Sequence, residues 1–307
     1  MGQGLNTKIL QIASAELGIN HTKIKVNATN TSKVPNTSAT AASAGTDLNG
    51  MAVKNAIDQL KSRIATLSAS QFSIDNEDKP SLAEDILFEN DFLIDGKNPD
   101  RKLAFSEMML RANLNQVSLS AAGFYKTPDV GWDKVKGWGK PFNYFAFGMC
   151  VSEVMVDTLT GYYKNLRTDI LHDAGDSINP GLDIGQVEGG YIQGVGWCTT
   201  EECKRDDKGN LLNHSPDTYK IPSVQDIPID FRTSLLQKAP NPNAIRKSKA
   251  IAEPPFMHGL ATWLAIKDAI SAVGNHKQEP HFKLPATNEV ILLSIDQLLG
   301  QDGKDMS

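Results

Sequence analysis

Five glycines lie inside an apolar pattern typical of a buried helix, between Gly181 and Thr200. The apolar side chains follow helical spacing and are Ile184, Val187, Tyr191, Ile192 and Val195. The glycines are residues 185, 189, 190, 194 and 196. Because each glycine in a helix interior costs about 1 kcal/mol relative to alanine, the pattern predicts a helix that packs tightly against another stretch of backbone or a bulky ligand.

Helical and strand-like patterns are mixed along the rest of the chain. Helices are predicted at Thr7–Leu17 with Gly18 at its end, from Ala41 through Ile64, at Phe105–Asn113, after Pro254-Pro255 and at Glu289–Leu299. Strands are predicted at Ile24–Val26, Val117–Tyr125, Phe142–Asp157, Tyr163–His172 and Ile227–Leu236. This mixture favours the α+β class. Residues 71–101 are acidic and contain the turn-forming run Asp95–Asp100, so we expect a surface excursion or hairpin there.

Composition and charge argue against several classes of partner. The chain has 307 residues, of which 40% are hydrophobic, and a formal net charge of −5 with both signs interleaved. This charge provides no basic surface for nucleic acid or for an anionic membrane. The sequence has no apolar run of about 18 residues and no signal-peptide pattern at its start, so we expect a cytoplasmic protein.

The three cysteines, Cys150, Cys198 and Cys203, are too few for a disulfide framework, and we expect free thiols. Cys198 and Cys203 have the spacing that opens a plant-type iron–sulfur pattern, but the sequence lacks the further cysteines of such a site. We therefore expect no cluster on this chain. The sequence also has no Gly-x-Ser-x-Gly and no His-Glu-x-x-His motif, which argues against a hydrolase or a zinc enzyme.

Two glycine-flanked segments are candidate ligand sites. Gln3 stands between glycines at a helix start, where backbone N–H groups and an amide suit a phosphate or a polar heterocycle, a plain glycine turn being the alternative. The dinucleotide fingerprint does not fit, because no strand is predicted before Gln3 and Thr7 occupies the place of its third glycine. Gln186 and Glu188 lie near the start of the glycine-rich helix, where the dipole favours an anion, although Glu188 equally suits a helix start by itself.

Glu253 is the strongest candidate for chemistry. It lies between the apolar run Ala250–Ala252 and the double proline Pro254-Pro255, which predicts a rigid and partly buried carboxylate. Burial without a cationic partner raises the pKa of a carboxyl group toward the range of a general base. Lys249 is close enough in sequence to oppose that rise, and a glutamate that only stabilises the following helix is the alternative.

A series of short motifs runs in order along most of the chain. They are Met1–Leu5 with Thr7-Lys8, Val34–Ser38, Thr40–Ser43, Ser118–Ser120, Gly123–Tyr125, Pro141–Phe145, Leu166–Ile170, Asn179-Pro180, Asp183–Gly189, Tyr219–Pro222, and Ser248–Ala250 leading into Glu253–Pro255. In this order they resemble the C-terminal part of the molybdopterin-binding domain of the xanthine dehydrogenase and aldehyde oxidase family. Residues 1–307 are therefore expected to form that portion of the domain, with its mixed sheets and helices.

The resemblance implies specific roles in the site. The residues that it places around the molybdopterin cofactor are Gln3, Ala42, Ser43 and Gln186. It makes Glu253 the active-site base, which takes the proton of a hydroxyl group that attacks an electrophilic purine carbon of xanthine or hypoxanthine while hydride passes from that carbon to the cofactor. The chain itself is expected to supply no metal ligand. A purine is favoured over an aldehyde by Pro254-Pro255 and by Ile227–Arg232.

The resemblance also implies partners. Iron–sulfur clusters and FAD are expected on modules outside this sequence. The upstream half of the domain, with further cofactor ligands and purine-orienting side chains, is expected from a longer chain or from a second polypeptide. Ala252 departs from the family, which usually has a glycine before its catalytic glutamate. A non-catalytic remnant that binds partner subunits and an aldehyde-oxidase-like hydroxylase are the alternative functions.

Overall fold

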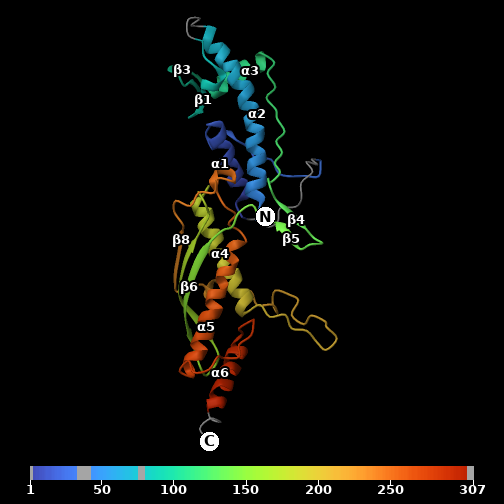
Figure 1. Ribbon diagram of the computed structural model, residues 1–307, viewed down its shortest axis with the longest axis vertical. Coiled ribbons are helices and arrows are strands. Elements are labelled where there is room, and N and C mark those ends of the chain that lie inside the picture. The colour runs from blue at the N-terminus through green and yellow to red at the C-terminus, as the bar shows by residue number, and fades with distance from the viewer. Residues whose placement is uncertain (1–2, 33–42, 75–79, 303–307) are drawn as a thin grey trace. The chain divides into compact units, whose positions relative to one another are not determined.

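The computed structural model describes residues 3–32, 43–74 and 80–302, and the chain divides into two compact units (Figure 1). The first comprises Met1–Phe145 with Pro240–Ser248, and the second comprises Ala146–Ala239 with Lys249–Ser307. Each unit combines helices with a small sheet, as expected for the α+β class.

The first unit is built around one long helix. Its elements are α1 (Leu5–Leu17), η1 (His21–Lys23), α2 (Gly45–Ile74), η2 (Ala83–Asp85), β1 (Ile86–Glu89), β2 (Phe92–Asp95), β3 (Asn98–Ala104), α3 (Phe105–Leu114), β4 (Gly131–Asp133), β5 (Trp138–Lys140) and η4 (Ile245–Lys247). Strands β1, β2 and β3 form an antiparallel sheet, and β4 pairs only with β5 in a separate hairpin. The predicted helices at Thr7–Leu17 and Phe105–Asn113 are confirmed.

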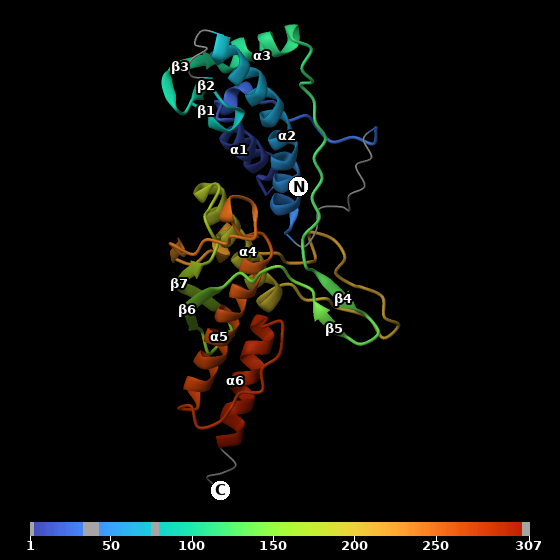
Figure 2. The same ribbon diagram turned by 45° about the horizontal axis from the view of Figure 1, so that its top comes forward.

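Helix α1 lies along the N-terminal half of α2 in both views (Figures 1 and 2). A Cβ built on Gly50 of α2 would lie 2.8 Å from Cδ1 of Ile12 of α1, and further on Nζ of Lys61 donates to the carbonyl of Glu16 over 3.0 Å. Contacts therefore advance in the same direction along both helices, so α1 and α2 are parallel and begin at the same end. Helix α1 ends at Gly18 as predicted, with φ of 66° and its N–H donating to the carbonyl of Ser14.

The second half of α2 forms the core of the first unit. Ile64, Ala65 and Ala69 are buried against Phe88 and Leu93 of the sheet. This packing explains why α2 continues to Ile74, ten residues beyond its predicted end at Ile64. The turn between β2 and β3 falls within Asp95–Asp100, where a hairpin was predicted.

The second unit holds a mixed sheet covered by helices. Its elements are β6 (Gly148–Val156), β7 (Tyr163–His172), α4 (Pro180–Thr199), η3 (Val224–Asp226), β8 (Asp230–Leu235), η5 (Pro254–Gly259), α5 (Leu260–Val273) and α6 (Asn288–Asp302). Strand β7 pairs antiparallel with β6 and parallel with β8. Its core joins Ile170 of β7 to Val187, Tyr191 and Val195 of α4 and to Ile251.

Two predicted strands are wrong. Ile24–Val26 and Val117–Tyr125 have no strand in the structure. The second segment runs along α2 and is held by side chains, because Arg63 donates to the carbonyl of Ser118 over 2.7 Å and Asn55 to that of Phe124 over 2.8 Å. A β-like sequence forms a strand only where a partner satisfies its backbone, and here helix side chains take that role. The strand predicted from Phe142 begins only at Gly148.

Candidate functional site

Gln3 and Ser43 lie at the N-terminal ends of the two parallel helices of the first unit. Gln3 precedes Gly4, the N-cap of α1, and Ser43 lies two residues before α2; both side chains are half-buried. Gly4 and Ser43 have positive φ values of 70° and 57°. Gly4 has no side chain to cap the first N–H groups of α1, whose first turn carries no acidic residue. Two helix N-termini at one end therefore direct positive dipoles to the same region. Ala42 lies outside the described residues.

Asp47 and Lys8 lie just inside these helix starts. Lys8 is 5% exposed, and the hydroxyl of Tyr144 donates to Oδ2 of Asp47 over 2.5 Å. Burial raises the pKa of Asp47, against the opposing effects of the Tyr144 hydrogen bond and of Lys8. The Lys8 ammonium adds positive charge beside the one carboxyl group in the first turn of α2. Its charge makes this end of the helix pair more favourable to an anion.

Gln186 of α4 and Glu253, which precedes η5, lie at the same end of the region in which α4 and η5 pack closely. A Cβ built on Gly190 would lie 3.0 Å from Cβ of Pro255, and one on Gly194 would lie 2.1 Å from the carbonyl oxygen of Phe256. Gln186 precedes Gly190 by one helical turn and Glu253 precedes Pro255 by two residues, so the fold brings this pair to the same end. Tight packing of the glycine-rich helix is confirmed, with η5 as its neighbour.

The glycines of α4 nevertheless lie in two different environments. A Cβ on Gly194 would lie 2.1 Å from the nearest atom and one on Gly196 2.4 Å, too close for a side chain, whereas one on Gly190 would make a tight contact of 3.0 Å with Cβ of Pro255. A Cβ on Gly185 or Gly189, by contrast, would meet nothing within 4 Å among the residues that the structure describes. The half-buried Gln186 and Glu188 belong to this first, more open part of the helix.

Glu253 is exposed, so its predicted partial burial is wrong. The reason is that Pro255 takes the buried position against α4, while Glu253 precedes the first turn of η5 and accepts the Phe256 N–H through its backbone carbonyl over 3.0 Å. Lys249 is engaged elsewhere: its ammonium pairs with buried Asp173 and lies 5.3 Å from the ring centroid of Phe147.

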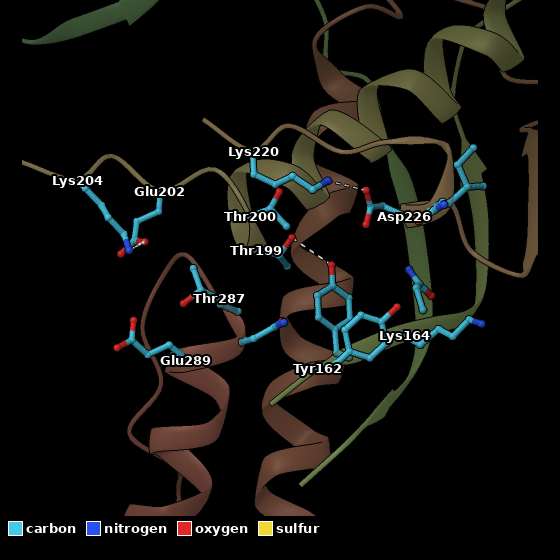
Figure 3. Close-up of a pocket in the computed structure, with 16 residues that line it drawn as sticks. Tyr162, Lys164, Thr199, Thr200, Glu202, Lys204, Lys220, Asp226, Thr287 and Glu289 are labelled. Carbon is cyan, nitrogen blue, oxygen red and sulfur yellow. Dashed lines mark hydrogen bonds and ion pairs between the residues drawn. The ribbon is translucent and has the colours of Figure 1, made fainter. Parts of the chain in front are cut away.

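A polar cavity of about 420 Å³ lies elsewhere in the second unit, between the start of β7, the end of α4 and the start of α6 (Figure 3). None of the candidate residues that the structure describes lines it. Its walls hydrogen bond among themselves, since Lys220 pairs with Asp226 over 2.9 Å and Tyr163 donates to Thr199 over 3.1 Å. No sequence motif indicated this cavity.

Other reactive side chains have modest roles. Cys150, Cys198 and Cys203 are free thiols, as predicted, and burial raises the pKa of Cys150 and of Cys198 to about 11.

Within residues 3–32, 43–74 and 80–302, no three His, Cys, Asp or Glu side chains are grouped to hold a metal ion. Among the helices that the structure describes, none is long and apolar enough to cross a membrane.

The fold also brings together two histidines that sequence spacing did not connect. His172 at the end of β7 and His258 in η5 are 86 residues apart, and their ring nitrogens lie 3.0 Å from each other. Such a pair has no local sequence signal, because it depends on how β7 and η5 pack.

Comparison with known proteins shows the same fold and related sequences. The chain is 43% identical to a xanthine dehydrogenase/oxidase of Gallus gallus over 294 residues, covering 95% of this chain and 20% of that protein. It is 42% identical to a xanthine dehydrogenase of Oryza sativa subsp. japonica, with 96% and 20% covered. It thus spans about a fifth of the length of these relatives. The crystal structure of a Cu,Mo-CO dehydrogenase shares the fold, with a TM-score of 0.80 at 24% identity over 97% of this chain and 35% of the other.

A family model supplies the assignment. The model described as the molybdopterin cofactor-binding domain matches residues 1–228. That range is more than half of the chain and includes the helix starts of the first unit and Gln186. The chain therefore belongs to the molybdopterin cofactor-binding domain family.

Proposed function

We propose that the chain is part of a cytoplasmic molybdenum hydroxylase that oxidises xanthine or hypoxanthine in purine catabolism. The observation that carries the proposal is the pair of parallel helices that begin beside Gln3 and Ser43, within a chain of a molybdopterin-binding family. The purine is supported by the names of the relatives at 42–43% identity, which are xanthine dehydrogenases.

Four residues are proposed to bind the cofactor, namely Gln3, Ala42, Ser43 and Gln186. The cofactor combines an anionic phosphate with a pterin rich in hydrogen-bond donors and acceptors, and when bound it supplies the redox centre of the reaction. The N-terminus of α1, which has no side-chain cap, and the positive charge of Lys8 suit the phosphate. Amide side chains such as those of Gln3 and Gln186 both donate and accept, which suits the pterin.

Glu253 is proposed as the general base. Its exposed carboxylate can reach a substrate, while the prolines that follow fix the backbone on which it stands. The carboxylate would accept the proton of the hydroxyl group that attacks the purine carbon, and this proton transfer makes the oxygen a stronger nucleophile. The ammonium group of Lys249 pairs with Asp173 and therefore does not compete with that proton for the Glu253 carboxylate.

The remaining parts of the enzyme are proposed to come from sequence beyond these residues. They are the upstream half of the cofactor-binding domain, which would orient the purine, and modules with iron–sulfur clusters and FAD, which would carry electrons away. An aldehyde-oxidase-like hydroxylase is the alternative for the substrate, and a non-catalytic remnant is the alternative for the activity.

The decisive experiment replaces Glu253 in the complete enzyme. Glu253→Gln keeps the shape but cannot accept the proton, so xanthine turnover should fall roughly 10²–10⁴-fold while molybdenum content stays unchanged. Glu289→Gln, an exposed glutamate in α6, is the matched control and should keep full turnover. Near wild-type turnover by Glu253→Gln would reject the base. Absence of turnover in fully loaded wild-type protein, with xanthine and with aldehydes, would favour the remnant.

A further inference from the structure

A pair of histidines joins the end of β7 to η5. Nδ1 of His172 lies 3.0 Å from Nε2 of His258, and the two ring centroids are 5.2 Å apart with an interplanar angle of 87°. His172 is 2% exposed and His258 is half-buried. At this distance one ring donates a hydrogen bond and the other accepts it.

Gly148 of β6 makes room for the pair. It is the antiparallel partner of His172 in the sheet. A Cβ built on Gly148 would lie 2.6 Å from Cε1 and 2.8 Å from Nε2 of His258, and 3.0 Å from Nδ1 of His172. Any side chain at this position would displace the His258 ring, so the contact depends on three residues from three elements.

The surroundings of His172 limit the protons that the pair can hold. Nε2 of His172 is buried and has no hydrogen-bond partner among the described residues. An orphaned N–H in the interior is rarer than an orphaned acceptor, so the favoured tautomer has Nδ1–H of His172 donating to Nε2 of His258. An added proton has two possible positions. On the accepting Nε2 of His258 it would face the N–H of His172, and on Nε2 of His172 it would form an N–H without a hydrogen-bond partner.

The charged groups around the pair do not remove this restriction. Burial and the neighbouring His258 lower the pKa of His172 to about 4, against the opposite effect of Asp173 and Asp183, and Lys249 lowers it further. Asp173 pairs with Lys249, and Asp183 accepts a hydrogen bond from Ser177 over 2.5 Å. Burial also lowers the pKa of His258. The pair is therefore suited to two uncharged rings.

We propose that the His172–His258 hydrogen bond is a positioning contact that holds η5, and through it Glu253, in place only while both rings are uncharged. The role of Glu253 in this statement rests on the function proposed above. Packing of Pro255 and Phe256 on α4 secures one side of η5, and His258 is a polar contact from η5 to the sheet. Protonation of the closed pair leaves a buried N–H without a partner or sets two N–H groups against each other; opening of the contact relieves this cost and frees the segment that begins directly after Glu253.

The test measures amide hydrogen exchange of η5 in the full chain within its complete assembly, at pH 7 and pH 5, corrected for intrinsic exchange. If an opened His172 has an ordinary pKa near 6.5 and the closed one about 4, linkage predicts that protection of η5 falls at least tenfold between these pH values. His214→Gln, which removes an exposed histidine, is the control and should behave as wild type.

Two variants separate the hydrogen bond from the charge. The amide N–H of Asn stands near the position of Nδ1–H and donates to Nε2 of His258 but cannot take up a proton, so His172→Asn should lose less than about threefold of its protection between pH 7 and pH 5. His258→Leu has no acceptor and should show low protection at both pH values. An unchanged wild type, or a fall in His172→Asn equal to that of wild type, would overturn the proposal, and His172→Asn carries the test if the leucine variant does not fold.

The pH dependence of turnover provides a second, independent test. In His172→Asn the acid limb of kcat should move to lower pH with KM unchanged, because the base stays in position. Retained turnover in Glu253→Gln would overturn the assignment of the base alone, since the exchange measurement does not depend on turnover.

Discussion

Gly194 of α4 and Gly259 of η5 meet backbone to backbone: a Cβ built on Gly259 would lie 2.3 Å from the carbonyl carbon of Gly194. Real Cβ atoms essentially never approach other atoms this closely. Only glycine at both positions allows α4 and η5 to lie at this separation, which also fixes where Glu253 enters η5 relative to Gln186.

Gly194→Ala is therefore expected to destabilise the protein by about 3 kcal/mol, at the upper end of the usual cost of overpacking, because the clash is with backbone that cannot rotate away. Gly189→Ala in the same helix is the matched control. In the described part of the chain a Cβ at Gly189 meets nothing within 4 Å, so alanine should stabilise by up to about 1 kcal/mol. Urea unfolding of both variants measures the difference, and equal effects would contradict the packing described.

The sequence predicted this close approach but not its partner. Glycines within an apolar helical pattern indicated tight packing, because such a helix must compensate for its glycines. That the neighbour is η5 depends on folding between segments about 60 residues apart in sequence. The strands predicted at Ile24–Val26 and Val117–Tyr125 were wrong for a related reason, since a strand requires a partner that local propensity does not specify.

The positions of the candidate site residues could likewise be predicted only in part. The glycine-flanked Gln3 was expected at a helix start, and it lies there. That α1 and α2 are parallel, so that Ser43 begins the second helix at the same end, follows from packing alone. Exposure of Glu253 was not predicted, because the buried position goes to Pro255. The His172–His258 contact was not predictable from residues 86 positions apart.

Tyr191→Phe is expected to destabilise the second unit by about 1–3 kcal/mol. The Tyr191 hydroxyl lies 2.7 Å from Nδ2 of Asn165, 2.8 Å from Oγ1 of Thr168 and 2.7 Å from Oγ1 of Thr262, all buried, and its loss leaves polar groups short of partners. Tyr162→Phe changes a side chain that is 54% exposed and should have almost no effect. Chemical denaturation of both variants is the measurement, and a neutral Tyr191→Phe would show that the remaining groups satisfy one another.

The stability of the second unit should fall in mild acid because of His172. Its folded pKa of about 4 is below the unfolded value near 6.5, so the unfolded state binds the proton first. The stability contributed by the neutral ring is complete above about pH 6.5, decreases as the pH falls, and is lost below about pH 4, amounting to about 3 kcal/mol.

The measurement is the free energy of unfolding of wild type and of His172→Asn between pH 7 and pH 4. Carboxyl groups with lowered pKa, such as those of Asp169 and Asp226, also reduce stability in acid, and the difference between the two proteins removes their contribution. Parallel pH curves for the two proteins would show that His172 titrates normally.

Gln186→Ala should weaken cofactor retention more than folding. The side chain is half-buried in the more open first part of α4, where a Cβ on Gly185 or Gly189 would contact none of the described residues, so little protein packing is lost with it. A cofactor group left without its amide partner costs about 1–3 kcal/mol, which corresponds to a loss of affinity of about 5- to 150-fold. Gln193→Ala, an exposed glutamine two turns further along α4, is the matched control and should keep both molybdenum and stability. Molybdenum content by mass spectrometry and the melting temperature, measured on the complete enzyme, separate the two roles. A lower melting temperature with unchanged molybdenum content would make Gln186 a structural residue and would leave cofactor binding to the helix starts of the first unit.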